Sequence, residues 1–150
     1  MIDEATRQAL DERLDAARAN LLAALADVTE RDFATDLGGV TVVQLLARVA
    51  GEERTAAARA AGGDYTPRPV EKPMPPQVIH ALAGARYRTR RYLESPEADD
   101  ATGFALVEAA EQREADAAAR IAARPPLPPL PEFHAAPEIP MIPPEQARRA

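Results

Sequence analysis

The side chains able to do chemistry in this chain are mostly charged groups placed on or beside apolar helical stripes. Arg48 directly follows Leu45-Leu46-Ala47 and lies one position off the apolar stripe of its segment, near the edge. It is four residues from Glu52, the spacing of an ion pair along one helix. Glu114 is more unusual, because it holds a stripe position that apolar residues hold one turn before and after it. These charges are the first candidates for a polar site.

Two histidines and several carboxylate pairs are weaker candidates. His80 lies among Val78, Ile79 and Leu82, where it is either a proton shuttle or a partly buried structural residue. Glu52 and Glu53 are adjacent, so on a helix they point in different directions and form a solvated charged face instead of converging on one ligand. The chain has no cysteine, which excludes a disulfide, a thiolate metal site and a thiol nucleophile.

A basic cluster stands near the end of one helical segment. Its members are Arg86, Tyr87, Arg88, Arg90, Arg91 and Tyr92. Arginine mixed with tyrosine can bind phosphate or stack a base. The positions wind around the helix, however, and acidic residues follow directly, so salt bridges and compensation of the helix dipole are the favoured interpretation. A net charge of −6 also argues against nucleic acid and anionic membranes as partners.

The composition favours packed helices in a soluble protein. Apolar residues make up 46% of the chain but aromatic residues only 4%, so alanine and leucine must fill the core. No apolar run approaches the roughly 18 residues that a membrane span needs. The first residues are acidic and lack the apolar core of a secretory signal. We therefore expect a cytoplasmic protein.

Helical periodicity divides the first 124 residues into four amphipathic segments. We expect helices over about residues 3–26, 41–61, 76–93 and 103–123, with Thr41 as a cap and Ile79 facing inward. The predicted fold is an all-α, up-and-down four-helix bundle spanning residues 1–124. Residues 125–150 hold nine of the fifteen prolines. This Pro-rich extension is expected to be extended and to pack on the bundle or on a partner subunit.

The pattern resembles the DinB-like superfamily of bacterial four-helix bundles over about residues 6–124. The likeness lies in the leucine seam of the first helix, the stretch GGVTVVQLLARVAGEE, the loop ending PMPPQVI, and EQREADAAARI in the last helix. The resemblance implies a divalent metal held by three histidines. In this chain those positions fall on Arg48, Arg113 and Ala117. Arginine stays protonated and alanine has no donor atom, so the metal site is expected to be lost, with no cofactor.

The resemblance also implies a polar site inside the bundle, and a cation from one helix paired with a carboxylate from another would fill it. We therefore hypothesise that Arg48 pairs with Glu114, with Glu52 and His80 as further polar residues of the cleft; the alternative is a solvated Arg48 paired only with Glu52. The preferred function is a non-catalytic homodimer that binds a small ligand or a protein. The alternative is a thiol-dependent transferase or isomerase of the mycothiol or bacillithiol type, in which Arg48 and Arg113 replace the metal by stabilising a thiolate.

Overall fold

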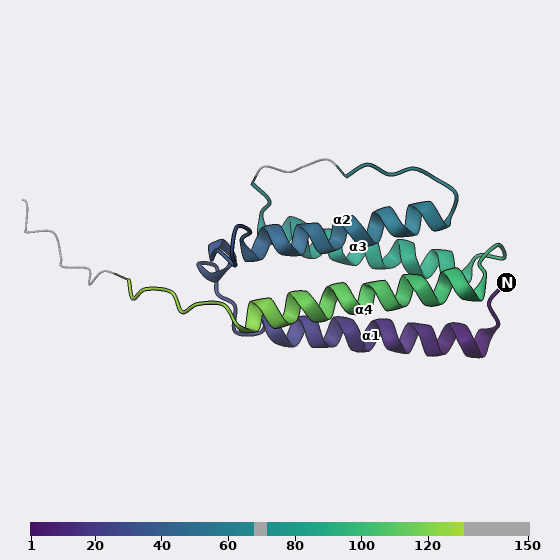
Figure 1. Cartoon of the computed structure of the whole chain (residues 1–150), viewed down its shortest axis with the longest axis horizontal. Helices are drawn as coiled ribbons and strands as arrows, with labels where there is room; N and C mark the ends of the chain where they lie inside the picture. The colour runs from purple at the N-terminus through teal and green to yellow at the C-terminus, as the bar shows by residue number, and fades with distance from the viewer. Residues whose placement is uncertain (68–71, 131–150) are drawn as a thin grey trace, which may run out of the picture.

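The computed structural model describes residues 1–67 and 72–130, and four long helices account for most of them. They are α1 (Glu4–Leu25), α2 (Val42–Ala60), α3 (Pro75–Glu94) and α4 (Asp100–Ala122), with a short 3-10 helix, η1 (Asp32–Ala34), before α2. The four long helices lie side by side as one bundle (Figure 1). The expected all-α four-helix bundle is confirmed.

The helix directions differ from the predicted up-and-down order. α1 and α4 run one way and α2 and α3 run the other, so two successive helices, α2 and α3, are parallel neighbours (Figure 1). The reason is the long connection between Ala60 and Pro75, whose ends lie at opposite ends of the bundle. A helix of this size is about 30 Å long, and a connection of this length can span that distance. The prediction of an up-and-down bundle was therefore wrong in topology.

Local capping fixes where the helices begin. Thr41 caps α2, since its hydroxyl accepts from the backbone N–H of Gln44 while the Gln44 side chain accepts from the N–H of Thr41. Asp99 caps α4 by accepting from the N–H of Thr102. α4 therefore starts at Asp100, three residues before the predicted Gly103.

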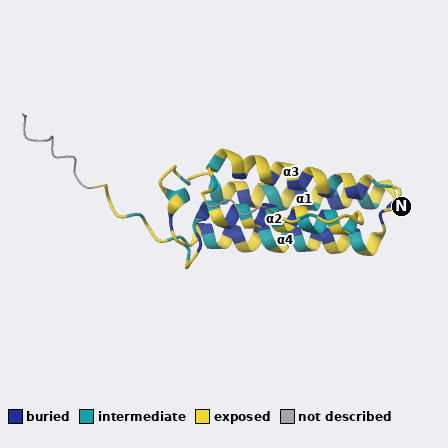
Figure 2. Ribbon diagram, turned by 90° about the horizontal axis from the view of Figure 1, so that it is seen from above, coloured by how far each residue is buried: buried dark blue, intermediate teal, exposed yellow. Residues whose placement is uncertain are grey.

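The core consists of two apolar clusters, one toward each end of the bundle. One cluster contains Leu21, Leu46, Leu82 and Ile121, and the other contains Leu10, Leu14, Leu93 and Val107. Along the helices, buried positions alternate with exposed ones (Figure 2), as expected for helices that turn one face to the core. Between the two clusters, at mid-length, each helix contributes a charged residue in place of an apolar one.

The predictions that Ile79 faces inward and that His80 is a partly buried residue were wrong. Ile79 is 42% exposed and His80 is also exposed, because the buried stripe of α3 runs through Val78 and Leu82 and turns both residues outward. The prediction that the Pro-rich extension packs on the bundle or on a partner subunit falls mostly on residues 131–150, which lie outside the described residues. None of the helices among the described residues has an apolar stretch that could span a bilayer.

Candidate functional site

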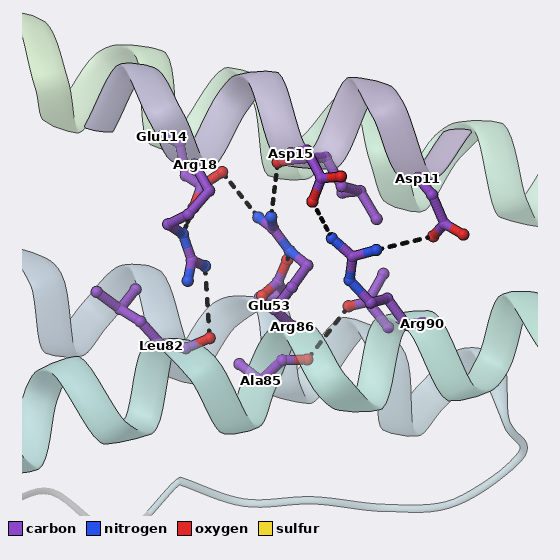
Figure 3. A network of polar contacts seen from close by, with 11 residues as sticks. Asp11, Asp15, Arg18, Glu53, Leu82, Ala85, Arg86, Arg90 and Glu114 are labelled. Atoms are coloured by element: carbon purple, nitrogen blue, oxygen red, sulfur yellow. Dashed lines mark hydrogen bonds and ion pairs between the residues drawn. The ribbon is translucent and has the colours of Figure 1, made fainter. Parts of the chain in front are cut away.

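The charged layer is the group Arg18, Glu53, Arg86 and Glu114, one residue from each long helix. Glu114 is 1% exposed, Glu53 is 4% exposed and Arg86 is 5% exposed, so three formal charges are withdrawn from water. With Arg18, which is partly buried, the four charges sum to zero. Figure 3 shows the four side chains converging between the helices.

Arg86 is the centre of the charged layer. Its Nε donates to Glu53 at 2.9 Å, its Nη2 donates to Glu114 at 2.7 Å, and its Nη1 donates to the carbonyl oxygen of Leu14 at 2.8 Å. Burial lowers the pKa of Arg86, but the carboxylates of Glu53 and Glu114 raise it by more, so the net shift is upward. The guanidinium therefore stays charged and bridges α1, α2 and α4 from its place on α3.

The second carboxylate oxygen of Glu114 is also used. It accepts from Nε of Arg18 at 2.6 Å, and Nη2 of Arg18 donates to the carbonyl oxygen of Leu82 at 3.4 Å. One turn beyond Arg86, Arg90 forms ion pairs with Asp11 and Asp15 on α1, nearer to solvent (Figure 3). Both buried carboxylates thus accept hydrogen bonds from arginine.

The hypothesis that Arg48 pairs with Glu114 was wrong. Arg48 is exposed, and Glu114 pairs with Arg86 and Arg18 instead. The reason is helical phase: Val49 and Glu53 lie on the buried face of α2, and Arg48 precedes that face by one residue. The alternative pairing with Glu52 is also absent, since no ion pair within 4.0 Å joins Arg48 to a described residue.

The three positions on which the resemblance places metal ligands offer no set of ligand atoms for a cation. Arg48 is exposed on α2, Arg113 is partly buried on α4, and Ala117 is part of the apolar core. Nε and Nη2 of Arg113 are buried and have no hydrogen-bond partner within residues 1–67 and 72–130. Over the same ranges, no group of three or more histidine, cysteine, aspartate or glutamate residues is placed to hold a metal ion. These residues do not fit the metal that the resemblance implies.

Two cavities lie on the outer α2–α3 side of the bundle. The crossover cavity, of about 610 Å³, is lined by residues that include Gln44, Arg48, Glu52, Pro67, Gln77 and Ala81. The arginine cavity, of about 570 Å³, lies nearer the C-terminal ends of the two helices. Its lining includes Ala57, Ala61, Arg88, Arg91, Tyr92 and Glu97. Arg54 and Tyr65 line both cavities, and the Arg54 guanidinium lies 4.3 Å from the centre of the Tyr65 ring. This stacked pair stands where the two cavities adjoin.

The candidate residues are therefore divided among separate places. Arg48 and Glu52 share the crossover cavity, Glu114 belongs to the charged layer, and His80 lines neither cavity. The burial of Glu53 and Arg86 was not predicted from the sequence, although a signal for it was present. Arg86 lies four residues after Leu82 and seven before Leu93, which places it on the buried stripe of α3.

The comparisons with known proteins assign no family to the chain. No family model matches it, and no curated protein or solved structure is significantly similar to it.

Proposed function

We propose that the chain is a non-catalytic helical bundle that binds a small ligand on its outer α2–α3 face. The main support is the contrast between the interior and that face. In the interior, Arg86 and Arg18 occupy the buried carboxylates, and apolar side chains fill the space on either side. On the outer face, two adjoining cavities of about 570 and 610 Å³ carry polar groups at their walls.

The size and lining of these cavities suit a small organic molecule. Ligand sites usually measure about 300–1,000 Å³ and combine an apolar surface with a few polar groups. Alanines, prolines and Tyr65 supply the apolar surface here, and Gln44, Gln77 and several charged residues supply the polar groups. This proposal moves the expected ligand from the central cleft of the bundle to its α2–α3 side.

The thiol-dependent reaction has less support. It required Arg48 and Arg113 to face one thiolate, but Arg48 lines the crossover cavity and Arg113 lines neither cavity. The homodimer remains a prediction. Ile79 and Tyr87 are exposed on α3 and would contribute apolar surface to such an interface. Light scattering on the purified full chain would measure its mass in solution, and a monomer at micromolar concentration would contradict the dimer.

A fragment screen with cavity-blocking variants tests the proposed function. Ligand-observed NMR on the full chain would identify small molecules that bind. Ala81→Trp fills the crossover cavity and Ala61→Trp fills the arginine cavity, and both positions are exposed enough to accept a ring. Ala115→Trp, at an exposed position of α4 outside both cavities, is the matched control. We expect at least one of the blocking variants to abolish binding that the control retains.

The proposal fails if no fragment binds, or if the bound fragments are insensitive to both blocking variants. Circular dichroism at 222 nm would check that each tryptophan variant keeps the helical content of the original chain. A fragment displaced equally by all three tryptophans would report a general surface effect and would also count against the proposal.

A further inference from the structure

The arginine cluster of α3 is divided by helical periodicity into two pairs with different surroundings. Arg86 and Arg90, four residues apart, form ion pairs with carboxylates of neighbouring helices. Arg88 and Arg91, three residues apart, line the arginine cavity beside α2. The first pair has a structural role, whereas no described carboxylate forms an ion pair with the second.

Three guanidinium groups border the arginine cavity without an ion-pair partner among residues 1–67 and 72–130. Arg88 and Arg91 come from α3 and Arg54 comes from α2, and none is within 4.0 Å of a carboxylate in the described part of the chain. Small side chains at the end of α2 leave the space open: Ala57, Ala58, Ala60 and the C-cap residue Ala61. The buried Tyr92 also lines the cavity, from α3. The cavity thus combines an apolar surface with cationic walls.

Two carboxylates also line this cavity and offset part of its positive charge. Asp64 and Glu97 follow the ends of α2 and α3, and both are exposed. With three arginines against two carboxylates, the lining carries a formal charge of +1 in a chain whose net charge is −6. The local sign is therefore opposite to that of the whole molecule.

Compensation of helix dipoles does not explain all three arginines. The dipole acts within about the last turn of a helix, and α3 ends at Glu94. Arg91 is in that turn, but Arg88 lies nearly one turn earlier and Arg54 lies six residues before the end of α2. Arg54 is instead stacked on Tyr65, which holds its planar group at the cavity wall.

We propose that the arginine cavity binds an organic oxyanion that carries a planar ring, such as an aryl phosphate or an aryl carboxylate. Arg88 and Arg91 would hold the oxyanion, because the planar guanidinium donates two parallel hydrogen bonds to such groups. The alanines of α2 would contact the ring, beside the Arg54–Tyr65 stack. This inference rests on the proposed function in that it names the class of ligand for one of the two cavities.

Titration of the ¹⁵N-labelled full chain with phenyl phosphate at neutral pH tests the proposal. We expect saturable amide shifts confined to residues 54–65 and 88–97. Inorganic phosphate lacks the ring and benzyl alcohol lacks the charge, so each should bind at least about tenfold more weakly than phenyl phosphate, a difference of about 1.4 kcal/mol. Benzoate distinguishes the two sources of charge: the tighter of benzoate and phenyl phosphate identifies the natural oxyanion.

Substitutions then locate the charge requirement. The double variant Arg88→Gln/Arg91→Gln should weaken phenyl phosphate binding about tenfold or more. Arg59→Gln removes an exposed arginine of α2 that lines neither cavity, and should leave binding unchanged. Ala61→Trp should block binding without removing charge, which keeps the test valid if the double variant fails to fold.

Several results would overturn the inference. They are shifts outside the cavity, equal weakening by Arg59→Gln, or binding of benzyl alcohol as tight as that of phenyl phosphate. If phenyl phosphate does not bind but the fragment screen finds molecules blocked by Ala81→Trp, the oxyanion site is refuted and the proposed function stands. If neither experiment detects binding, both are refuted.

Discussion

Replacing Arg86 with methionine tests the charged layer most directly. Methionine keeps the length of the buried stem but removes all three donors. Glu53, which is 4% exposed, loses its ion-pair partner, whereas Glu114 keeps Arg18. Removing one partner of a buried ion pair costs about 3–5 kcal/mol. A domain of this size has only about 5–15 kcal/mol of stability, so the variant should lose a large share of it.

Urea unfolding followed by circular dichroism at 222 nm measures this loss. For an m value of about 2 kcal/mol per molar urea, the expected cost lowers the midpoint by about 2 M. Arg90→Met is the matched control, because Arg90 lies one turn further along α3 and pairs with Asp11 and Asp15 nearer to solvent. Its cost should be at most about 1 kcal/mol.

A second substitution separates charge from packing. Arg86→Met/Glu53→Met removes both partners of one pair and leaves Arg18 and Glu114 together. The double variant should be more stable than Arg86→Met alone, because no carboxylate is left buried without a cation. Lowering the pH should narrow the deficit of Arg86→Met, since the abandoned carboxylate can then take up a proton. An Arg86→Met variant within about 1 kcal/mol of the original chain, or no more destabilised than Arg90→Met, would refute the reasoning.

Two further predictions concern helix ends and helix surfaces. Hydrogen bonds from the backbone N–H of Thr102, which has the larger effect, and from the Thr102 hydroxyl lower the pKa of Asp99 below its ordinary value of 3.8. A carboxylate whose pKa is lower in the folded state contributes stability above about pH 4, and this stability is lost as the pH falls through the folded pKa. On acidification, the melting temperature of Asp99→Asn should therefore decline less steeply than that of the original chain. Gly84→Ala should stabilise the chain by about 0.5–1 kcal/mol, because a Cβ there meets no atom within 4 Å and alanine favours the helix. A fall in the urea midpoint of Gly84→Ala would instead show that this face of α3 is covered in solution.

The four helices could be predicted from the sequence because their apolar stripes are regular. The stripe of α4, including its charged member Glu114, is buried as its spacing indicates. The partner of Glu114 could not be assigned so simply. Arg48 and Arg86 both stand close to an apolar stripe, and only the phase of each helix decides which one faces the interior. Because Arg86 was grouped with the neighbouring arginines as one basic cluster, its own position on the buried stripe of α3 was overlooked.

The cavities could not be predicted, because they depend on which helices are neighbours. A regular up-and-down bundle makes each helix antiparallel to the next, which would place the end of α2 beside the start of α3. In the observed topology α2 and α3 are parallel, so their C-terminal halves lie together and bring Arg54 to the same cavity as Arg88. The length of the connection between Ala60 and Pro75 permits this arrangement but does not by itself specify it.

The charged layer and the arginine cavity are linked through the register of α2 and α3. The hydrogen bond between Glu53 and Arg86 joins the two helices at one level, and the next residue on α2, Arg54, lines the cavity together with Arg88. Sliding either helix by one turn, about 5.4 Å, would move a buried charge into an apolar cluster and away from its partner. The interior ion pair therefore opposes such a slip more strongly than alanine and leucine packing alone, and in doing so keeps Arg54, Arg88 and Arg91 at one cavity.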